Sequence, residues 1–160
     1  MRRRYILVLL GCALSCACSR LQQVRSEDKN DMGTINHPNG MSVRYDGDKF
    51  SVRQIDNGFE FLDSNAAYVR SPSSVEVRLE PGSEPSGQWP KTKDVDGRRV
   101  HYRIEMRLGG SGGDEYTLVG WTDCSASHYL SIRQKVEAET AEAADFSSAW
   151  ALLGATTCPR

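Results

Sequence analysis

The sequence has little of what most catalytic and metal sites are built from. Only three of its 160 residues are histidines, at positions 37, 101 and 128. None of them stands at a metal-ligand spacing from another histidine, a cysteine or a carboxylate. The many serines are not accompanied by visible machinery for nucleophilic catalysis. We therefore expect no metal, no other cofactor and no enzymatic activity.

The sequence also lacks an apolar run of the roughly 20 residues that a membrane-spanning helix needs. The short apolar stretch Tyr5–Leu10 follows three arginines and precedes small residues and cysteines. This layout is typical of a secretory signal, and its cysteines favour a lipoprotein signal over residues 1–18. We predict acylation of Cys18, with Cys16 and Cys12 as alternatives. An ordinary secretory signal with incidental cysteines is the competing interpretation.

The residue after the predicted acylation site bears on where the protein resides. Ser19 stands there instead of aspartate, which is similar to lipoproteins sorted to the outer membrane. We therefore expect a periplasmic protein that a lipid anchors, at the outer membrane.

Neither sign of charge dominates the chain. Without the three arginines of the signal, 17 basic residues stand against 21 acidic ones, which gives a net charge of −4. A domain of this charge is not expected to bind nucleic acid.

Cysteine is scarce after the signal, where only Cys124 and Cys158 remain. Two cysteines in a small domain of an oxidising compartment predict a disulfide rather than a metal site or a nucleophile. Two unpaired buried thiols are the alternative.

Polar and breaker-rich residues follow the predicted anchor. Residues 19–40 show no apolar period of either kind, which predicts a flexible tether. A first strand around Thr34–Asn36 is the alternative. The folded domain is expected to cover residues 41–160.

Most of this domain shows the two-residue alternation of strands, interrupted by turn pairs. Asp56-Asn57-Gly58 predicts a tight hairpin, because Asn and Gly accept the positive φ of a two-residue turn. Residues 82–97 are predicted to form a long loop, in which Trp89 is either a buried lid residue or an exposed anchor. Strands are predicted around residues 42–45, 50–52, 59–61, 67–70, 74–80, 98–108, 116–121 and 128–136. In the clearest of them, Val100, Tyr102, Ile104, Met106 and Leu108 are predicted to face the core.

Only the end of the chain has a helical pattern, over Glu137–Gly154. Its apolar stripe consists of Phe146, Ala149, Trp150 and Leu153, and Asp145 or Thr140 is the predicted cap. This stripe must pack on the sheet, because nothing else apolar remains to receive it. The predicted fold class is α+β: one antiparallel sheet of about seven to eight strands, with one C-terminal helix packed on it.

A glycine-rich connection is predicted between the strands that end at Leu108 and begin near Tyr116. Phosphate binding is not expected there, because the glycines lead into Asp114 and Glu115 and not into a helix. An adaptable loop that docks on a partner would use Gly112, Gly113, Asp114, Glu115 and Tyr116. A passive hairpin tip is the alternative.

Several of these features together resemble a known family. The short lipoprotein signal, the polar tether, the Phe-x-x-x-Trp-x-Leu-Leu helix and the segments Gln54–Glu60 and Gly109–Tyr116 are similar to the periplasmic immunity lipoproteins of type VI secretion. The resemblance is greatest to those that oppose a peptidoglycan-cleaving muramidase. It implies a stoichiometric inhibitor that plugs the groove of an effector protein, a peptidoglycan hydrolase, with Asp114, Glu115 and Tyr116 in contact.

Two further interpretations stay open at this point. A structural or assembly lipoprotein of the envelope would expose an apolar patch on its sheet or helix. A carrier of a small ligand would hold a cavity between the helix and the sheet.

Overall fold

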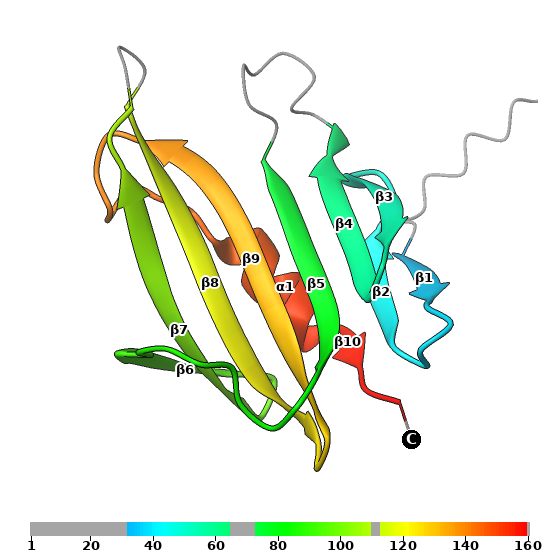
Figure 1. Ribbon diagram of the computed structural model, residues 1–160. Helices are drawn as coiled ribbons and strands as arrows, with labels where there is room; N and C mark the ends of the chain where they lie inside the picture. The colour runs from blue at the N-terminus through cyan, green and yellow to red at the C-terminus, as the bar shows by residue number, and fades with distance from the viewer. Residues whose placement is uncertain (1–31, 65–72, 110–112, 160) are drawn as a thin grey trace, which may run out of the picture.

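Two antiparallel sheets and one helix make up the computed structural model, which describes residues 32–64, 73–109 and 113–159 (Figure 1). The predicted strand at 67–70 and the signal cysteines lie outside these residues. The larger sheet has the strand order β3-β4-β5-β9-β8-β7-β6. Its strands are β3 (Phe50–Ile55), β4 (Gly58–Asp63), β5 (Ser74–Pro81), β6 (Lys91–Val95), β7 (Arg98–Arg107), β8 (Asp114–Ser125) and β9 (His128–Ala138). The predicted α+β class, with an antiparallel sheet and one C-terminal helix, is confirmed.

A second, three-stranded sheet was not anticipated. It has the order β1-β2-β10 and consists of β1 (Met32–Asn36), β2 (Ser42–Asp46) and β10 (Thr156–Thr157). Residues 32–36 were predicted to lie in the tether, whereas β1 pairs with β2 along its whole length, from Met32↔Asp46 to Asn36↔Ser42. The alternative prediction, a first strand near Thr34–Asn36, is therefore the correct one for this segment. Backbone pairing with β2 stabilises the strand, although its sequence has no strong apolar pattern of its own.

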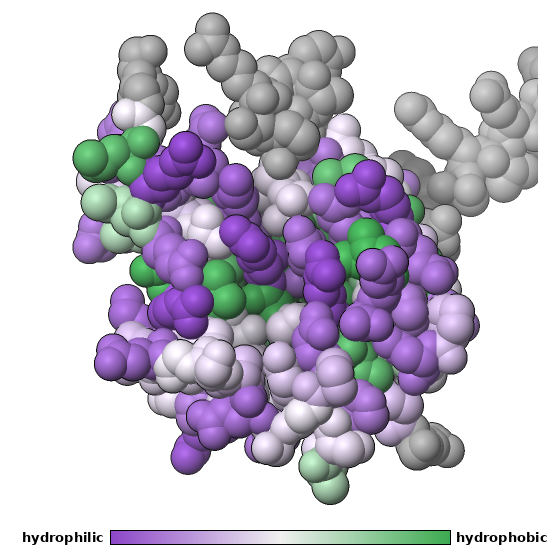
Figure 2. Space-filling model, in the orientation of Figure 1, coloured by the Kyte–Doolittle hydropathy of each residue, from purple (hydrophilic) through white to green (hydrophobic). Residues whose placement is uncertain are grey.

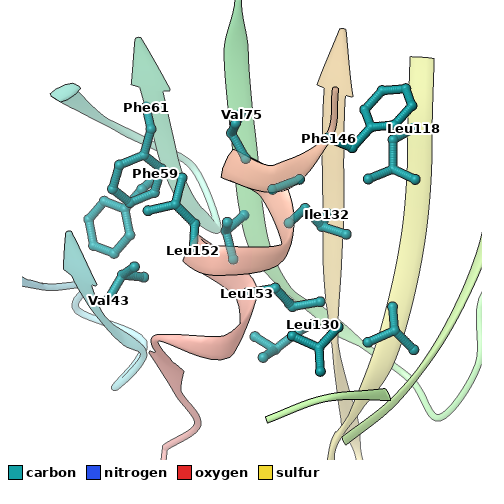
Figure 3. Close-up of a cluster of buried hydrophobic side chains, with 14 of the residues drawn as sticks. Val43, Phe59, Phe61, Val75, Leu118, Leu130, Ile132, Phe146, Leu152 and Leu153 are labelled. Atoms are coloured by element: carbon teal, nitrogen blue, oxygen red, sulfur yellow. The ribbon is translucent and has the colours of Figure 1, made fainter. Parts of the chain in front are cut away.

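The helix α1 (Ser147–Gly154) covers one face of the larger sheet, where it lies against β5, β9 and β6, and it also contacts β2 of the smaller sheet. It buries Ala149, Leu152 and Leu153. Figure 3 shows Leu152 on the side of Val43 and Phe59, and Leu153 on the side of Leu130. The single core therefore lies between the helix and the two sheets, as the apolar stripe of the helix required.

The helix is much shorter than the predicted segment Glu137–Gly154. Strand β9 continues through Ala138, which pairs with Asp114 of β8, and the helix begins only at Ser147. Alanine-rich composition favours a helix only weakly, and the ladder with β8 overrides it at residues 137 and 138. The predicted long loop over 82–97 is also partly wrong, since β6 occupies Lys91–Val95 and pairs with β7.

Two glycines act differently from each other in the hairpins. Asp96 and Gly97 take positive φ values of 49° and 76°, as the turn between β6 and β7 demands. Gly58 has no positive φ, contrary to the expected turn geometry. It is required by close approach instead, because a Cβ there would lie 2.0 Å from the carbonyl oxygen of Val77 on β5.

Within the described residues, no helix combines the length and the apolar character that crossing a membrane requires.

Candidate functional site

The β7–β8 hairpin projects beyond the part of the sheet that the helix covers. Its ladder ends at Arg107↔Glu115, and the neck above it is closed by a hydrogen bond from the N–H of Gly109 to Oδ1 of Asp114, at 3.1 Å. Both neck glycines are needed. A Cβ on Gly109 would lie 1.9 Å from the carbonyl oxygen of Gly113, and Gly113 itself has a φ of 105°. The two glycines thus let the chain segments approach closely, which makes the base of the hairpin tip narrow.

The same segment has the spacing Gly-x-Ser-x-Gly over residues 109–113. In hydrolases this spacing forms an elbow that leads from a strand into a helix. Here it connects two antiparallel strands. A strand and not a helix follows the segment, so the context of a nucleophile elbow is not met.

Two large apolar side chains at this end of β7 are exposed. Met106 is 58% exposed and Leu108 is 78% exposed, although both were predicted to face the core. They continue the face that Val100 begins, but no part of the chain that the structure describes packs closely enough on them to bury them. The alternation was thus predicted correctly and the burial was not, because the helix is only eight residues long.

The acidic residues at the base of the hairpin are partly buried and already engaged. Asp114 accepts the neck hydrogen bond from Gly109. Glu115 forms an ion pair with Lys135 of β9, at 3.1 Å between Oε2 and Nζ, and its side chain is 26% exposed. The two carboxylates lie next to each other in sequence on opposite faces of β8, so only one of them can face a given partner.

Tyr116 occupies a different position from the one expected. It is 4% exposed and belongs to the core cluster with Leu118. Its ring is therefore a packing residue that supports the hairpin, and the expectation that it contacts a partner needs correction. Gly112, the first residue of the predicted contact set, lies outside the described residues.

Cys124 and Cys158 are joined by a disulfide, with 5.6 Å between their Cα atoms. The bond connects the end of β8 to the tail after β10. It lies far along the strand from the hairpin, so its role is to hold the chain end in place.

An aromatic cluster on the face of the sheet opposite the helix went unnoticed in the sequence. Trp121 is 6% exposed and stacks on His101, with 4.9 Å between ring centroids and 17° between planes. Trp89 and Tyr129 meet it edge-on, at 6.4 and 6.1 Å. The register of β7 and β8 places His101 opposite Trp121, and this pairing was the signal that could have revealed the cluster.

Figure 2 shows this outer face, where mostly hydrophilic side chains surround small hydrophobic areas. Among the residues that the structure describes, no group of three or more histidines, cysteines or carboxylates could hold a metal ion.

The geometry defines an antiparallel α+β domain with a projecting β7–β8 hairpin. A family model described as the type six secretion immunity 3 domain matches residues 34–157. The chain belongs to this family, and it is therefore a type VI secretion immunity protein. This membership implies a cognate effector as its binding partner and suggests an inhibitor without catalysis of its own.

A solved structure shares the fold. A crystal structure from Bacteroides thetaiotaomicron VPI-5482 matches with a TM-score of 0.60 and 11% identity, over 82% of this chain. Only 50% of that protein is covered, so this chain spans half its length, and the similarity shows the fold alone. A comparison with curated proteins gives no match.

Proposed function

We propose that this immunity protein binds and blocks a cell-wall-degrading effector in the periplasm, while a lipid on Cys18 anchors it to the outer membrane. The family membership supports the immunity role, and the signal layout of residues 1–18 supports the anchor. The resemblance to immunity proteins that oppose a muramidase supports the kind of effector. An effector that attacks the wall acts in the periplasm, and an inhibitor must be held in the same compartment.

The observation that carries the proposed contact surface is the exposure of Met106 and Leu108. They lie two residues apart on an extended segment, so they share one face. Methionine is enriched at protein interfaces, and a contiguous exposed apolar patch marks an interaction site more often than single exposed residues do. We name Met106, Leu108 and the adjoining Asp114 the hairpin patch.

The hairpin patch combines the two properties that a groove-blocking element needs. Its apolar side chains supply surface to bury, and Asp114 supplies a carboxylate beside them. A groove that binds glycans offers hydrogen-bond donors and cations, which a carboxylate can satisfy in place of substrate. The tight neck at Gly109 and Gly113 limits the conformations of the hairpin before binding, which reduces the entropy that ordering costs.

The experiment that tests this proposal is a capture from periplasmic and secreted extracts, with the full-length chain as bait. A Met106→Asp/Leu108→Asp variant serves as the second bait, and Met32→Asp is the matched control. Met32 is 53% exposed but lies on β1, on the other side of the molecule from the hairpin (Figure 1).

We expect the wild-type chain and Met32→Asp to capture one peptidoglycan hydrolase, and the hairpin variant to lose it. Loss of at least one hot-spot residue weakens binding by about 2 kcal/mol, or roughly 30-fold. Capture of a toxin of another class would contradict the proposed cell-wall target and would not contradict the immunity role. Equal capture by all three baits would contradict the hairpin patch as the contact surface.

A further inference from the structure

Strand β7 is longer than its neighbour β6, so part of one edge of β7 has no strand beside it. The pairing with β6 ends at Lys91↔Tyr102, whereas β7 continues to Arg107. In the strand order of the larger sheet, β6 is the last strand and only β8 lies on the other side of β7. Figure 1 shows β6 beside the lower part of β7 only. Residues 103–107 therefore form an edge of the sheet.

The backbone groups of this edge point away from β8. Residues 96–97 form a two-residue turn, across which the N–H of Arg98 donates to the carbonyl oxygen of Val95. This orientation alternates along a strand, so the N–H and C=O groups of Ile104 and Met106 also point to the β6 side, beyond the end of β6. No backbone hydrogen bond outside the ladders of the described residues involves them. These groups are available to another strand.

The side chains along the edge form one apolar row and one charged row. Ile104 is half-buried, and Met106 and Leu108 are exposed, all three on the helix side of the sheet. Glu105 and Arg107 lie between them on the outer face, and both are exposed. A strand that pairs with this edge must therefore offer apolar residues on one face and charges of both signs on the other. The same segment of a second copy meets this requirement.

Antiparallel pairing of two such edges, centred on Met106, satisfies these groups in both copies. Met106 of one copy then lies opposite Met106 of the other, and each donates its N–H to the carbonyl oxygen of its counterpart. On the helix side, Ile104 of each copy lies opposite Leu108 of the other. On the outer face, Glu105 of each copy lies opposite Arg107 of the other, because a two-fold axis repeats every contact. Apolar pairs and pairs of opposite charge directly across two strands are both stabilising.

The other symmetric registers conflict with the sequence or with β6. Centring the pair on Glu105 or Arg107 places that residue against its own copy, and like charges directly opposite are destabilising. Centring it on Ile104 places Met106 opposite Tyr102, where β6 already pairs. The register centred on Met106 avoids both conflicts.

The two charged side chains can reach across the edge. Oε1 of Glu105 accepts a hydrogen bond from Nε of Arg103 on its own strand, at 2.8 Å, and the side chain of Glu105 remains 48% exposed. Its Oε2 is left for Arg107 of the other copy. Arg107 forms no ion pair with another residue that the structure describes.

We propose that a second copy of this chain pairs with the free edge of β7, so that the two larger sheets join into one continuous sheet across a two-fold axis at Met106. Met106 and Leu108 also belong to the hairpin patch, so this pairing and an effector contact through that patch exclude each other. The dimer is thus the state of the free protein. The proposal does not rest on the proposed effector and is tested on the chain alone.

The test is sedimentation equilibrium of the purified full-length chain over a range of concentrations. Glu105→Arg sets two cations opposite each other at both charged pairs of the dimer, and Arg107→Glu sets two anions there. An equimolar mixture of these two variants restores opposite charges at both positions. Arg99→Glu is the matched control, because Arg99 lies on the same strand outside the paired segment and its side chain is 73% exposed.

We expect the wild-type chain and Arg99→Glu to dimerise with a dissociation constant on the order of 10 μM, as a small interface allows. Glu105→Arg and Arg107→Glu should each dimerise at least about tenfold more weakly on their own. Their mixture should return to the wild-type dissociation constant as a heterodimer. That recovery would also show that both variants fold.

Three results would overturn the proposal. One is a wild-type chain that stays monomeric at hundreds of micromolar, including one whose β7 edge pairs only with the purified effector. Another is a mixture of the two variants that associates no better than either variant alone. The third is a loss of association in Arg99→Glu as large as in Glu105→Arg and Arg107→Glu, which would place the contact on another surface.

Discussion

Gln134 of β9 holds the first turn of α1 from across the core. Its Oε1 accepts a hydrogen bond from the N–H of Ala149 at 3.0 Å, and its Nε2 donates to the carbonyl oxygen of Asp145 at 3.4 Å. The helix has no side-chain cap from its own N-cap residue, Phe146. A strand residue that is only 3% exposed therefore satisfies backbone groups that the helix leaves unpaired.

We predict that Gln134→Met destabilises the domain by about 1–3 kcal/mol, because the N–H of Ala149 is left buried without an acceptor. Urea unfolding measures the change. Gln54→Met is the control, since Gln54 is exposed on β3 and its replacement should stay within about 0.5 kcal/mol. Equal effects of the two substitutions would show that the contact with α1 contributes nothing.

The disulfide closes a long segment, with a sequence separation of 34. Replacing both Cys124 and Cys158 by alanine should lower the free energy of unfolding by about 2–4 kcal/mol, because the unfolded chain regains the freedom of that loop. Reductant should bring the wild-type protein to the stability of the double variant and leave the double variant unchanged. A wild-type protein that is indifferent to reductant under unfolding conditions would contradict this prediction.

We predict that Asp145, which precedes the helix, makes a pH-dependent contribution to the stability of the fold. The backbone N–H and the hydroxyl of Ser147 both donate to its carboxylate, at 2.8 and 3.0 Å, and they hold its pKa below the usual 3.8. A carboxyl group whose pKa is lower in the folded state stabilises the fold above its unfolded pKa. That contribution is lost as the pH falls through the folded pKa.

The measurement compares thermal unfolding of the wild-type protein and Asp145→Asn from pH 7 down to pH 2. The wild-type protein should be the more stable of the two at neutral pH, and the difference should shrink below about pH 4. A difference that stays constant over this range would show that the ionised carboxylate makes no special contribution.

The predicted anchor is tested by metabolic labelling with a palmitate analogue. Cys18→Ser should abolish the label and release the chain from the membrane fraction, whereas Cys12→Ser and Cys16→Ser should keep both. Label on Cys18→Ser but not on one of the other two variants would move the acylation site. No label on the wild-type chain would favour an ordinary secretory signal.

The sequence was sufficient for the fold class because its strongest patterns are local. Alternation identified β5 and β7, and the helical stripe of Phe146, Ala149 and Leu153 is buried in the structure as expected. The alternation of apolar and polar residues was insufficient to predict strands that form only through pairing with segments distant in sequence or low in apolar residues. β1 and β6 are short, polar strands, and only their partners β2 and β7 make them strands.

The candidate site was predictable only in part for a similar reason. The glycine-rich hairpin and its acidic residues stand out in the sequence. Whether Met106 is covered and Tyr116 is buried depends on how far the helix extends over the sheet, and the alanine-rich composition predicted too long a helix. The aromatic cluster required the register between β7, β8 and β9, which no single strand specifies.

The pairing of β2 with β10 has a kinetic consequence. Strand β2 pairs on one side with β1, which is close to it in sequence. On its other side it pairs with β10 near the end of the chain, where Thr156 lies opposite Val43. Contacts of such large sequence separation form slowly, because the intervening chain must be ordered first. The second sheet cannot be completed until the last residues of the chain are available to pair. Until then one edge of β2 has no strand paired to it, so a chain that lacks its last residues cannot complete the fold.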